Sequence, residues 1–228
     1  MKKVRKLVIG DIHGYHDQMM EVFEKANFNF ETDHLISLGD LVDRGPKPIE
    51  VIEMLMQVRN FTLILGNHDD WFLKYLEDGI EDYSWVYQGG EETLDAYEGK
   101  QEVIERHREF LLKAKLYHID DKNRLFVHAG FNPDLPFDEQ KDRKDTLIWD
   151  RSMVYTAIEY EKKGQQFDAF SEIFVGHTPT RIVEKTTPQK FSNLWMIDTG
   201  VYLSGILTMM DIETREFWQS TGFEQTRT

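Results

Sequence analysis

Residues 39–45, GDLVDRG, bring two carboxylates and a guanidinium together directly after an apolar run at 35–38. Such a run is typical of a buried strand, and open α/β sheets bind ligands at the carboxyl ends of their strands. Asp40 therefore stands where a carboxylate can hold metal, and its two oxygen atoms can bridge two cations. Asp43 could orient an acid, and the Arg44 fork suits phosphate. Taken alone, the stretch could equally be an ordinary turn into a helix, with Asp43 as a cap and Arg44 solvated.

Two further turns repeat this arrangement. An apolar run at 4–9 ends in GDIHG, and another at 61–65 ends in GNHD. Asp11 and His13 can converge on one cation if the turn between them is tight, although singly this is also a glycine-rich turn with an exposed histidine. Because strands here alternate with helices, we expect a parallel sheet whose strand ends lie side by side. Core packing alone does not account for three such turns, so the sequence predicts one shared site.

Two later histidines also follow β-rich apolar runs. His128 comes directly after 125–127, and His177 comes shortly after 173–175. A single histidine in a turn is more often structural than a ligand, but a position just past a strand favours ligation. Arg151, in the stretch LIWDR, is either a phosphate-binding group or a stray surface charge.

The candidate ligands are three hard oxygen donors and three imidazoles: Asp11, His13, Asp40, Asn67, His128 and His177. They suffice for two divalent cations that share one carboxylate, and mixed oxygen and nitrogen ligation favours Mn²⁺, Fe or Zn²⁺ over Ca²⁺. Two cations about 3.5–4 Å apart would activate a water and stabilise in-line displacement at phosphorus. His68 adjoins a ligand without being one, so it is placed to protonate the leaving oxygen, with Asp43 orienting it.

The composition is that of a folded protein rather than a disordered one. Of the 228 residues, 40% are hydrophobic and 30% charged, and 27 basic against 41 acidic residues give a formal charge of −14. This charge would repel a nucleic-acid backbone. There is no cysteine, no apolar run of about 18 residues, and too short a first apolar run for a signal peptide. We therefore expect a cytoplasmic protein with neither a nucleic-acid nor a membrane partner.

The length predicts one α/β domain over residues 1–228. Residues 71–116 interrupt the strand–helix alternation with an acidic, aromatic, helical pattern, which we interpret as a cap-like insert over the sheet edge. Its aromatic residues are expected to make core or helix–helix contacts rather than a substrate wall: Trp71, Tyr75, Trp85, Tyr87 and Tyr97. The runs at 194–200 and 205–210 are expected to be strands of a second sheet.

Five ordered motifs spanning residues 7–211, namely GDIHG, GDLVDRG, GNHD, HAG and GHT, resemble the phosphoprotein phosphatase family of calcineurin-like metallophosphoesterases. The similarity is greatest to the bacterial and phage serine/threonine phosphatases and to the symmetrical diadenosine tetraphosphatases. It implies an α-β-β-α sandwich of two mixed sheets, which agrees with the strand pattern.

The resemblance also implies a role for each matching residue. Asp11 and His13 would bind the first cation, and Asn67, His128 and His177 would bind the second. Asp40 would bridge the two cations. His68 would be the general acid paired with Asp43, while Arg44 and Arg151 would bind phosphate.

One position departs from the protein phosphatases of this family, which usually have Glu where this chain has Asp69. GNHD is more similar to the diadenosine tetraphosphatases, so the departure concerns the substrate and not the chemistry. We expect a phosphoric monoester hydrolase that uses two divalent metal ions per chain, with Mn²⁺ favoured and Fe or Zn²⁺ as alternatives. Its substrate is expected to be a phosphorylated protein or peptide or a small phosphoester. The alternatives are a dinucleoside polyphosphate hydrolase acting on a small nucleotide, and a catalytically inactive phosphate-binding protein.

Overall fold

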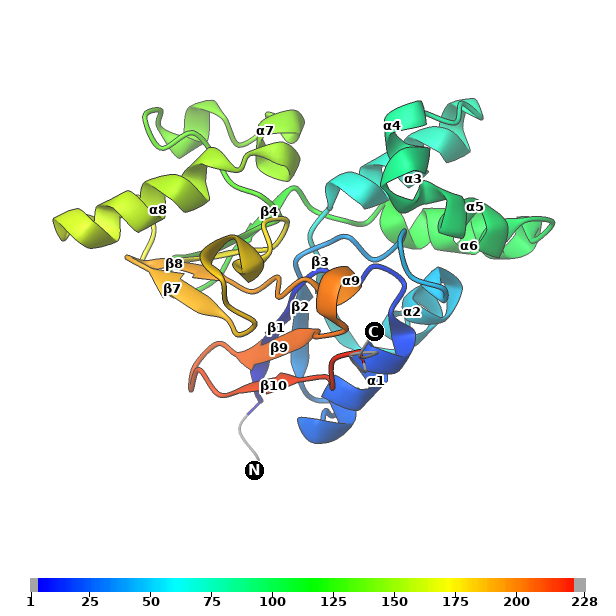
Figure 1. The fold of residues 1–228 in the computed structure, drawn as a ribbon, viewed down its shortest axis with the longest axis horizontal. Helices are drawn as coiled ribbons and strands as arrows, with labels where there is room; N and C mark the ends of the chain where they lie inside the picture. Colours follow the sequence, from blue (N-terminus) through cyan, green and yellow to red (C-terminus); the bar gives the residue numbers. More distant parts are fainter. Residues whose placement is uncertain (1–3, 224–228) are drawn as a thin grey trace, which may run out of the picture.

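The computed structural model describes residues 4–223, which form two mixed β-sheets flanked by helices (Figure 1). The first sheet has the strand order β10-β9-β1-β2-β3. Its parallel strands are β1 (Lys6–Ile9), β2 (His34–Ser37) and β3 (Asn60–Leu63). Two antiparallel strands complete it, β9 (Thr208–Asp211) and β10 (Phe217–Gln219). The predicted parallel arrangement of the first three strands is confirmed.

The second sheet has the order β4-β5-β6-β8-β7. Its parallel strands are β5 (Arg124–Val127), β6 (Glu172–Val175) and β8 (Leu194–Met196). Antiparallel strands lie at both edges, β4 (Tyr117–Ile119) and β7 (Gln189–Phe191). The prediction for 205–210 was wrong: β9 pairs with β1 in the first sheet. The short helix α9 (Val201–Ser204) separates it from β8 and lets the chain change sheets.

Side chains alternate along the strands between two cores, as a period of two requires. In β1, Leu7 and Ile9 pack with the helices that cover the first sheet, whereas Val8 points to the second sheet. In β5, Leu125 packs with the helices of the second sheet, and Phe126 joins Val8 between the sheets. The predicted helix–sheet–sheet–helix sandwich is therefore confirmed.

Helices from both halves of the chain cover the outer faces. On the first sheet lie α1 (His16–Lys25) and α2 (Pro48–Leu55). On the second sheet lie α7 (Lys144–Trp149) and α8 (Ser152–Lys163). Short 3-10 turns η2 (Phe137–Glu139) and η3 (Thr180–Val183) lie in the connections.

The segment 71–116 is helical, as its pattern predicts, and it packs with α2 and the first sheet (Figure 1). It comprises most of α3 (Asn67–Asp78) and all of α4 (Tyr83–Trp85), the π-helical turn η1 (Val86–Gly90), α5 (Glu91–Tyr97) and α6 (Gln101–Leu111). Trp85 and Tyr97 are buried in this core, as expected. The prediction for Tyr87 was wrong, because this side chain is 81% exposed and stacks on the equally exposed Tyr83. Within residues 4–223, no helix is long and apolar enough to cross a bilayer.

We expect Phe126→Ala to lower the free energy of unfolding by about 3–5 kcal/mol, the range for removing a buried phenylalanine. Its ring is fully buried between the sheets and stacks on Phe174 with ring centroids 4.9 Å apart. Urea denaturation measures the change. Tyr155→Ala, at a side chain that is 56% exposed, is the control and should change stability by less than about 0.5 kcal/mol. Equal effects of the two substitutions would contradict this account of the inter-sheet core.

Candidate metal centre

The turns that follow β1 and β2 are bonded to each other through their backbones. Ile12 N and His13 N both donate to the carbonyl oxygen of Asp40, at 3.0 and 2.8 Å, and Gly14 N donates to Leu41 O at 2.8 Å. Because neighbouring parallel strands end at the same edge, these bonds fix His13 and Asp40 against each other. Both residues adopt a positive φ, 49° and 52°, which an ordinary side chain adopts at a cost.

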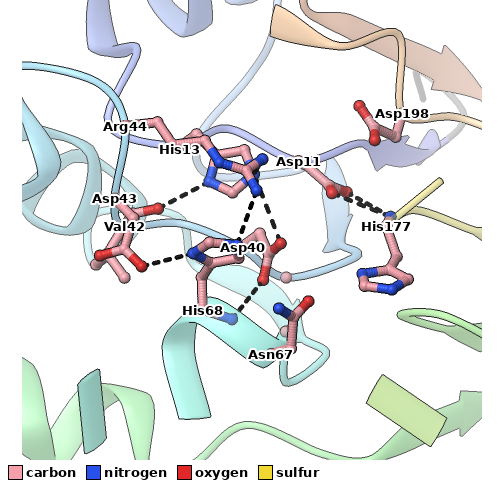
Figure 2. A network of polar contacts seen from close by, with 12 residues as sticks. Asp11, His13, Asp40, Val42, Asp43, Arg44, Asn67, His68, His177 and Asp198 are labelled. Carbon is pink, nitrogen blue, oxygen red and sulfur yellow. Dashed lines mark hydrogen bonds and ion pairs between the residues drawn. The ribbon is translucent and has the colours of Figure 1, made fainter. Parts of the chain in front are cut away.

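The turn after β3 approaches Asp40 so closely that a glycine is required. A Cβ at Gly66 would lie 2.3 Å from the backbone nitrogen of Asp40. The approach lets His68 N donate to the Asp40 carboxylate at 3.0 Å. All three predicted turns therefore meet at Asp40 (Figure 2).

Two of the imidazoles are held by backbone carbonyl groups through Nδ1. His13 Nδ1 lies 2.9 Å from Val42 O, and His128 Nδ1 lies 2.7 Å from Leu38 O. A carbonyl oxygen only accepts, so Nδ1 carries the proton in both rings and Nε2 directs its lone pair into the site. This is the arrangement in which an imidazole binds a metal.

The Asp40 carboxylate lies between these two rings. Its Oδ2 is 3.5 Å from His13 Nε2, and its Oδ1 is 3.5 Å from His128 Nε2. One oxygen thus faces each imidazole, which is the geometry a bridging carboxylate needs. Two groups of potential ligand atoms, each lying within 4.8 Å of one another, share Asp40: His13–Asp40–His68 and Asp40–His128–His177.

His177 provides an independent indication that a cation fits this centre. Its Nε2 is buried and lacks a hydrogen-bond partner among residues 4–223. Burial lowers the pKa of His177 to about 2, so the ring is neutral and its lone pair is available. A buried polar atom without a partner is costly, and a metal ion would satisfy it.

Three buried carboxylates lie close together here: Asp11, Asp40 and Asp198. Burial, followed by the charges of Asp198 and Asp40, raises the pKa of Asp11 well above its ordinary value. Burial also raises the pKa of Asp198 to about 6. Bound divalent cations would relieve this repulsion, so the donors present fit the metal centre that the sequence predicts.

The four other candidate residues surround these donors. His68 Nδ1 donates to Asp43 Oδ2 at 2.6 Å, and both side chains are buried. The Arg44 guanidinium donates to Nε2 of His13 at 2.7 Å and of His68 at 2.9 Å (Figure 2). Arg151 is exposed at the start of α8, and its Nη1 donates to His177 O at 3.0 Å.

The structure thus brings all ten predicted site residues to one edge of the two sheets. Asn67 Oδ1 lies 3.0 Å from His128 Nε2, and Asp11 accepts from the backbone nitrogen of His177 at 3.0 Å. Asp11 is not a member of either compact group of ligand atoms, whereas His68 is. The individual ligand assignments therefore stay predictions.

Asp69 does not face the substrate side of the site. It is fully buried, and its carboxylate accepts from Asp40 N at 2.8 Å, Leu41 N at 2.8 Å and Gly66 N at 3.2 Å. Its role is to hold two metal-centre turns together. The choice of Asp or Glu here consequently carries no direct information about the substrate.

Several residues at the site were missed by the sequence analysis. Asp198 follows β8, so the strand-end rule that found the other ligands could have found it. The Arg44 Cζ atom lies 4.0 Å from the centre of the Tyr202 ring in α9. Trp71 and Trp149 pack edge to face, with ring centroids 4.6 Å apart, and lie against His68 and His177 respectively. For these aromatic residues no local sequence signal exists, because the contacts join distant elements.

Buried carboxylates and imidazoles lie together at the edge where the two sheets meet, with Arg44 and Arg151 beside them. This arrangement defines a metal-dependent phosphoesterase. The sequence profile of the calcineurin-like phosphoesterases matches residues 4–201. The chain is 30% identical to serine/threonine-protein phosphatase 2 of Escherichia coli, over 90% of this chain and 92% of that protein. It is 28% identical to an asymmetrical bis(5'-nucleosyl)-tetraphosphatase of Halalkalibacterium halodurans, over 92% and 91% of the two chains.

The fold is shared with a solved structure described as a candidate diadenosine tetraphosphatase. The TM-score is 0.68 at 20% identity, with 98% of this chain and 96% of that chain covered. The chain therefore belongs to the calcineurin-like phosphoesterase family and is a metal-dependent phosphatase. Members of this family bind two divalent metal ions, and the Asp40-centred groups fit such a site.

We expect the wild-type protein to bind close to two Mn²⁺ ions per chain, and Asp40→Asn to lower that number, because a neutral amide cannot bridge two cations. Elemental analysis after loading and desalting measures the stoichiometry. Asp95→Asn, at an exposed carboxylate in α5, is the control and should keep the wild-type value. An Asp40→Asn protein that binds the same number of ions as the wild type would refute the bridging role.

Proposed function

We propose that the protein is a phosphoric monoester hydrolase of the serine/threonine protein phosphatase type. The observation that supports this substrate class is the placement of the cations in residues 71–116. Lys74 pairs with Asp70 at 3.0 Å, and Arg106 pairs with Glu53. Lys113 and Lys115 line a separate cavity of about 390 Å³ beside β3. Within residues 4–223, none of these four groups is recorded in contact with the metal centre, whereas Arg44 and Arg151 lie beside it and would bind a single phosphoryl group.

The proposed mechanism assigns each step to a residue of this chain. Asp11 and His13 would hold one cation, Asp40 would bridge, and a second cation would be held by Asn67, His128 and His177. Such cations, when bound, supply an acidified water and positive charge at phosphorus. The two arginines would orient the equatorial phosphoryl oxygens through paired hydrogen bonds.

His68 would donate the proton that the leaving oxygen needs. Its Nδ1–H is bound to Asp43, so Nε2 faces the site. Nε2 accepts a hydrogen bond from Arg44 in this structure and, once it has taken up a proton, would be the atom that passes the proton to the leaving oxygen. The buried Asp43 carboxylate stabilises the protonated ring and holds its orientation. We propose Mn²⁺ as the native metal, with Fe or Zn²⁺ as alternatives, because all the proposed ligands are oxygen and imidazole nitrogen.

The same proposal treats the protein as one domain in which residues 71–116 form a cap-like insert. Support comes from the insert's packing in the same core as β1, β2 and α2. A cytoplasmic location is part of the proposal, and the absence of cysteine is compatible with it.

Hydrolysis of dinucleoside polyphosphates is the second candidate. It is supported by the relative from Halalkalibacterium halodurans, which covers as much of this chain as the protein phosphatase does. The pair of Trp71 and Trp149 beside the metal centre could stack on a nucleobase.

We expect His68→Asn to lower kcat by about 10²–10⁴, the usual contribution of a general acid. The loss should be smaller on 2,4-dinitrophenyl phosphate than on phenyl phosphate, because a good leaving group needs little protonation. Steady-state kinetics and metal analysis of the same preparations test this. His16→Asn, at a histidine that lies outside the centre in α1, is the control. Loss of a metal ion from the His68→Asn protein would reassign His68 as a ligand.

The substrate class is tested by comparing kcat/KM for a phosphoserine or phosphothreonine peptide with that for diadenosine tetraphosphate. We expect the peptide to be preferred. A preference of about a hundredfold for the dinucleotide, some 2.7 kcal/mol in transition-state binding, would establish the second candidate instead. Hydrolysis of neither substrate, nor of an aryl phosphate, would favour an inactive phosphate-binding protein.

A further inference from the structure

The dipeptide Asp43–Arg44 has an unfavourable backbone conformation. Its φ angles are 71° and 67°, in the left-handed region that residues with a Cβ rarely adopt. Such a conformation is strained and persists only where surrounding contacts impose it. Those contacts come from residues 85–93 of the helical insert, which we call the clamp segment.

The clamp segment binds Asp43 through side chains. Asp43 Oδ2 accepts from Trp85 Nε1 at 2.8 Å, in addition to its bond from His68. Asp43 Oδ1 accepts from the Thr93 hydroxyl at 2.6 Å, and the same hydroxyl oxygen accepts from Asp43 N at 2.9 Å. Each of these four side chains is at least 98% buried. Every side-chain hydrogen bond that Trp85 and Thr93 make in the described structure is thus to the Asp43 carboxylate or to the Asp43 backbone nitrogen.

The clamp segment binds Arg44 through its backbone. Arg44 N donates to Gly89 O at 2.8 Å, and Arg44 Nε donates to Gln88 O at 3.2 Å. Gly89 has a φ of 107°, and a Cβ there would lie 2.5 Å from Arg44 Cγ. Only glycine permits this approach, so the left-handed turn of the clamp segment is fitted to Arg44.

We propose that Trp85 and Thr93 are positioning residues for the reaction, acting on His68 through Asp43. The proposal rests on the general-acid role of His68 given above. Each Asp43 oxygen has one bond from the clamp segment, so the carboxylate cannot rotate, and the remaining lone pair of Oδ2 points at His68 Nδ1. Without the Thr93 hydroxyl, a buried carboxylate oxygen and a buried amide would both lose their partner, and the carboxylate would reorient.

A packing role and a positioning role for Thr93 and Trp85 predict different effects on the rates of different substrates. If Thr93 and Trp85 only support packing, their loss should affect all substrates alike. If they orient Asp43 and hence His68, the loss should be confined to esters whose leaving oxygen needs a proton.

The test compares Thr93→Val, which has nearly the same shape without the hydroxyl, with Thr93→Ser, which keeps it. Thr93→Val should lower kcat on phenyl phosphate by about tenfold, at the lower end of effects seen for outer partners of active-site groups. Its kcat on 2,4-dinitrophenyl phosphate, its KM and its bound Mn²⁺ should remain close to wild type, and Thr93→Ser should restore the phenyl phosphate rate. Trp85→Phe should reproduce the Thr93→Val pattern. Tyr87→Phe, in the same segment but exposed, is the matched control.

A second readout does not depend on activity. In the metal-free protein, the His68 Nδ1 proton bound to Asp43 should give a downfield ¹H NMR resonance, assigned by its absence in His68→Asn. The resonance should shift or broaden in Thr93→Val and Trp85→Phe and should be retained in Thr93→Ser and Tyr87→Phe. An unchanged resonance in Thr93→Val, or an equal loss of rate on both esters, would overturn the proposal.

The two readouts separate this proposal from the proposed function. If wild type and His68→Asn show the same dependence on the leaving group, the general-acid role fails, while the NMR comparison still decides whether the clamp segment orients the pair. If Thr93→Val does not fold, Trp85→Phe and Thr93→Ser carry the same comparison.

Discussion

Asp40 connects the turns on which the metal centre depends. Its carbonyl oxygen accepts from the turn after β1, its backbone nitrogen donates to Asp69 in the turn after β3, and its carboxylate accepts from His68 N. The same carboxylate presents one oxygen to His13 and the other to His128. Because Asp40 is hydrogen-bonded to the turns after β1 and β3 and faces His128 after β5, a displacement of its turn would move proposed ligands from both sheets together.

The electrostatics of the centre differ from those of the protein as a whole. A chain with a formal charge of −14 repels an anionic substrate, and the buried carboxylates of Asp11 and Asp198 add to that effect. Bound metal ions would reverse the sign locally, and the Arg44 guanidinium lies against His13 and His68 and over the ring of Tyr202. The proposed recognition of phosphate therefore depends on a small region of positive potential within an acidic protein.

The helical insert is part of the site as well as part of the core. Its buried aromatic residues pack with the first sheet, and its Trp85 and Thr93 reach the Asp43 carboxylate. The residues that join the insert to Asp43 are 42 and 50 positions distant in sequence. Folding of the insert and the geometry of the candidate acid are consequently coupled.

The sequence by itself determined the chemistry and the sheet edge at which it occurs. Glycine followed by Asp or Asn after an apolar run is a local signal, and parallel strands necessarily bring such ends together. The sequence alone therefore placed Asp11, Asp40 and Asn67 at one sheet edge. Tertiary structure decided what no local pattern encodes. It placed β9 in the first sheet and left Tyr87 exposed. It directed the Asp69 carboxylate to backbone N–H groups and brought Asp198, Tyr202, Trp85 and Thr93 to the site. These outcomes depend on contacts between segments far apart in the chain. A residue of a given type can lie in a core, on a surface or in a site, and only its neighbours in the folded structure decide which.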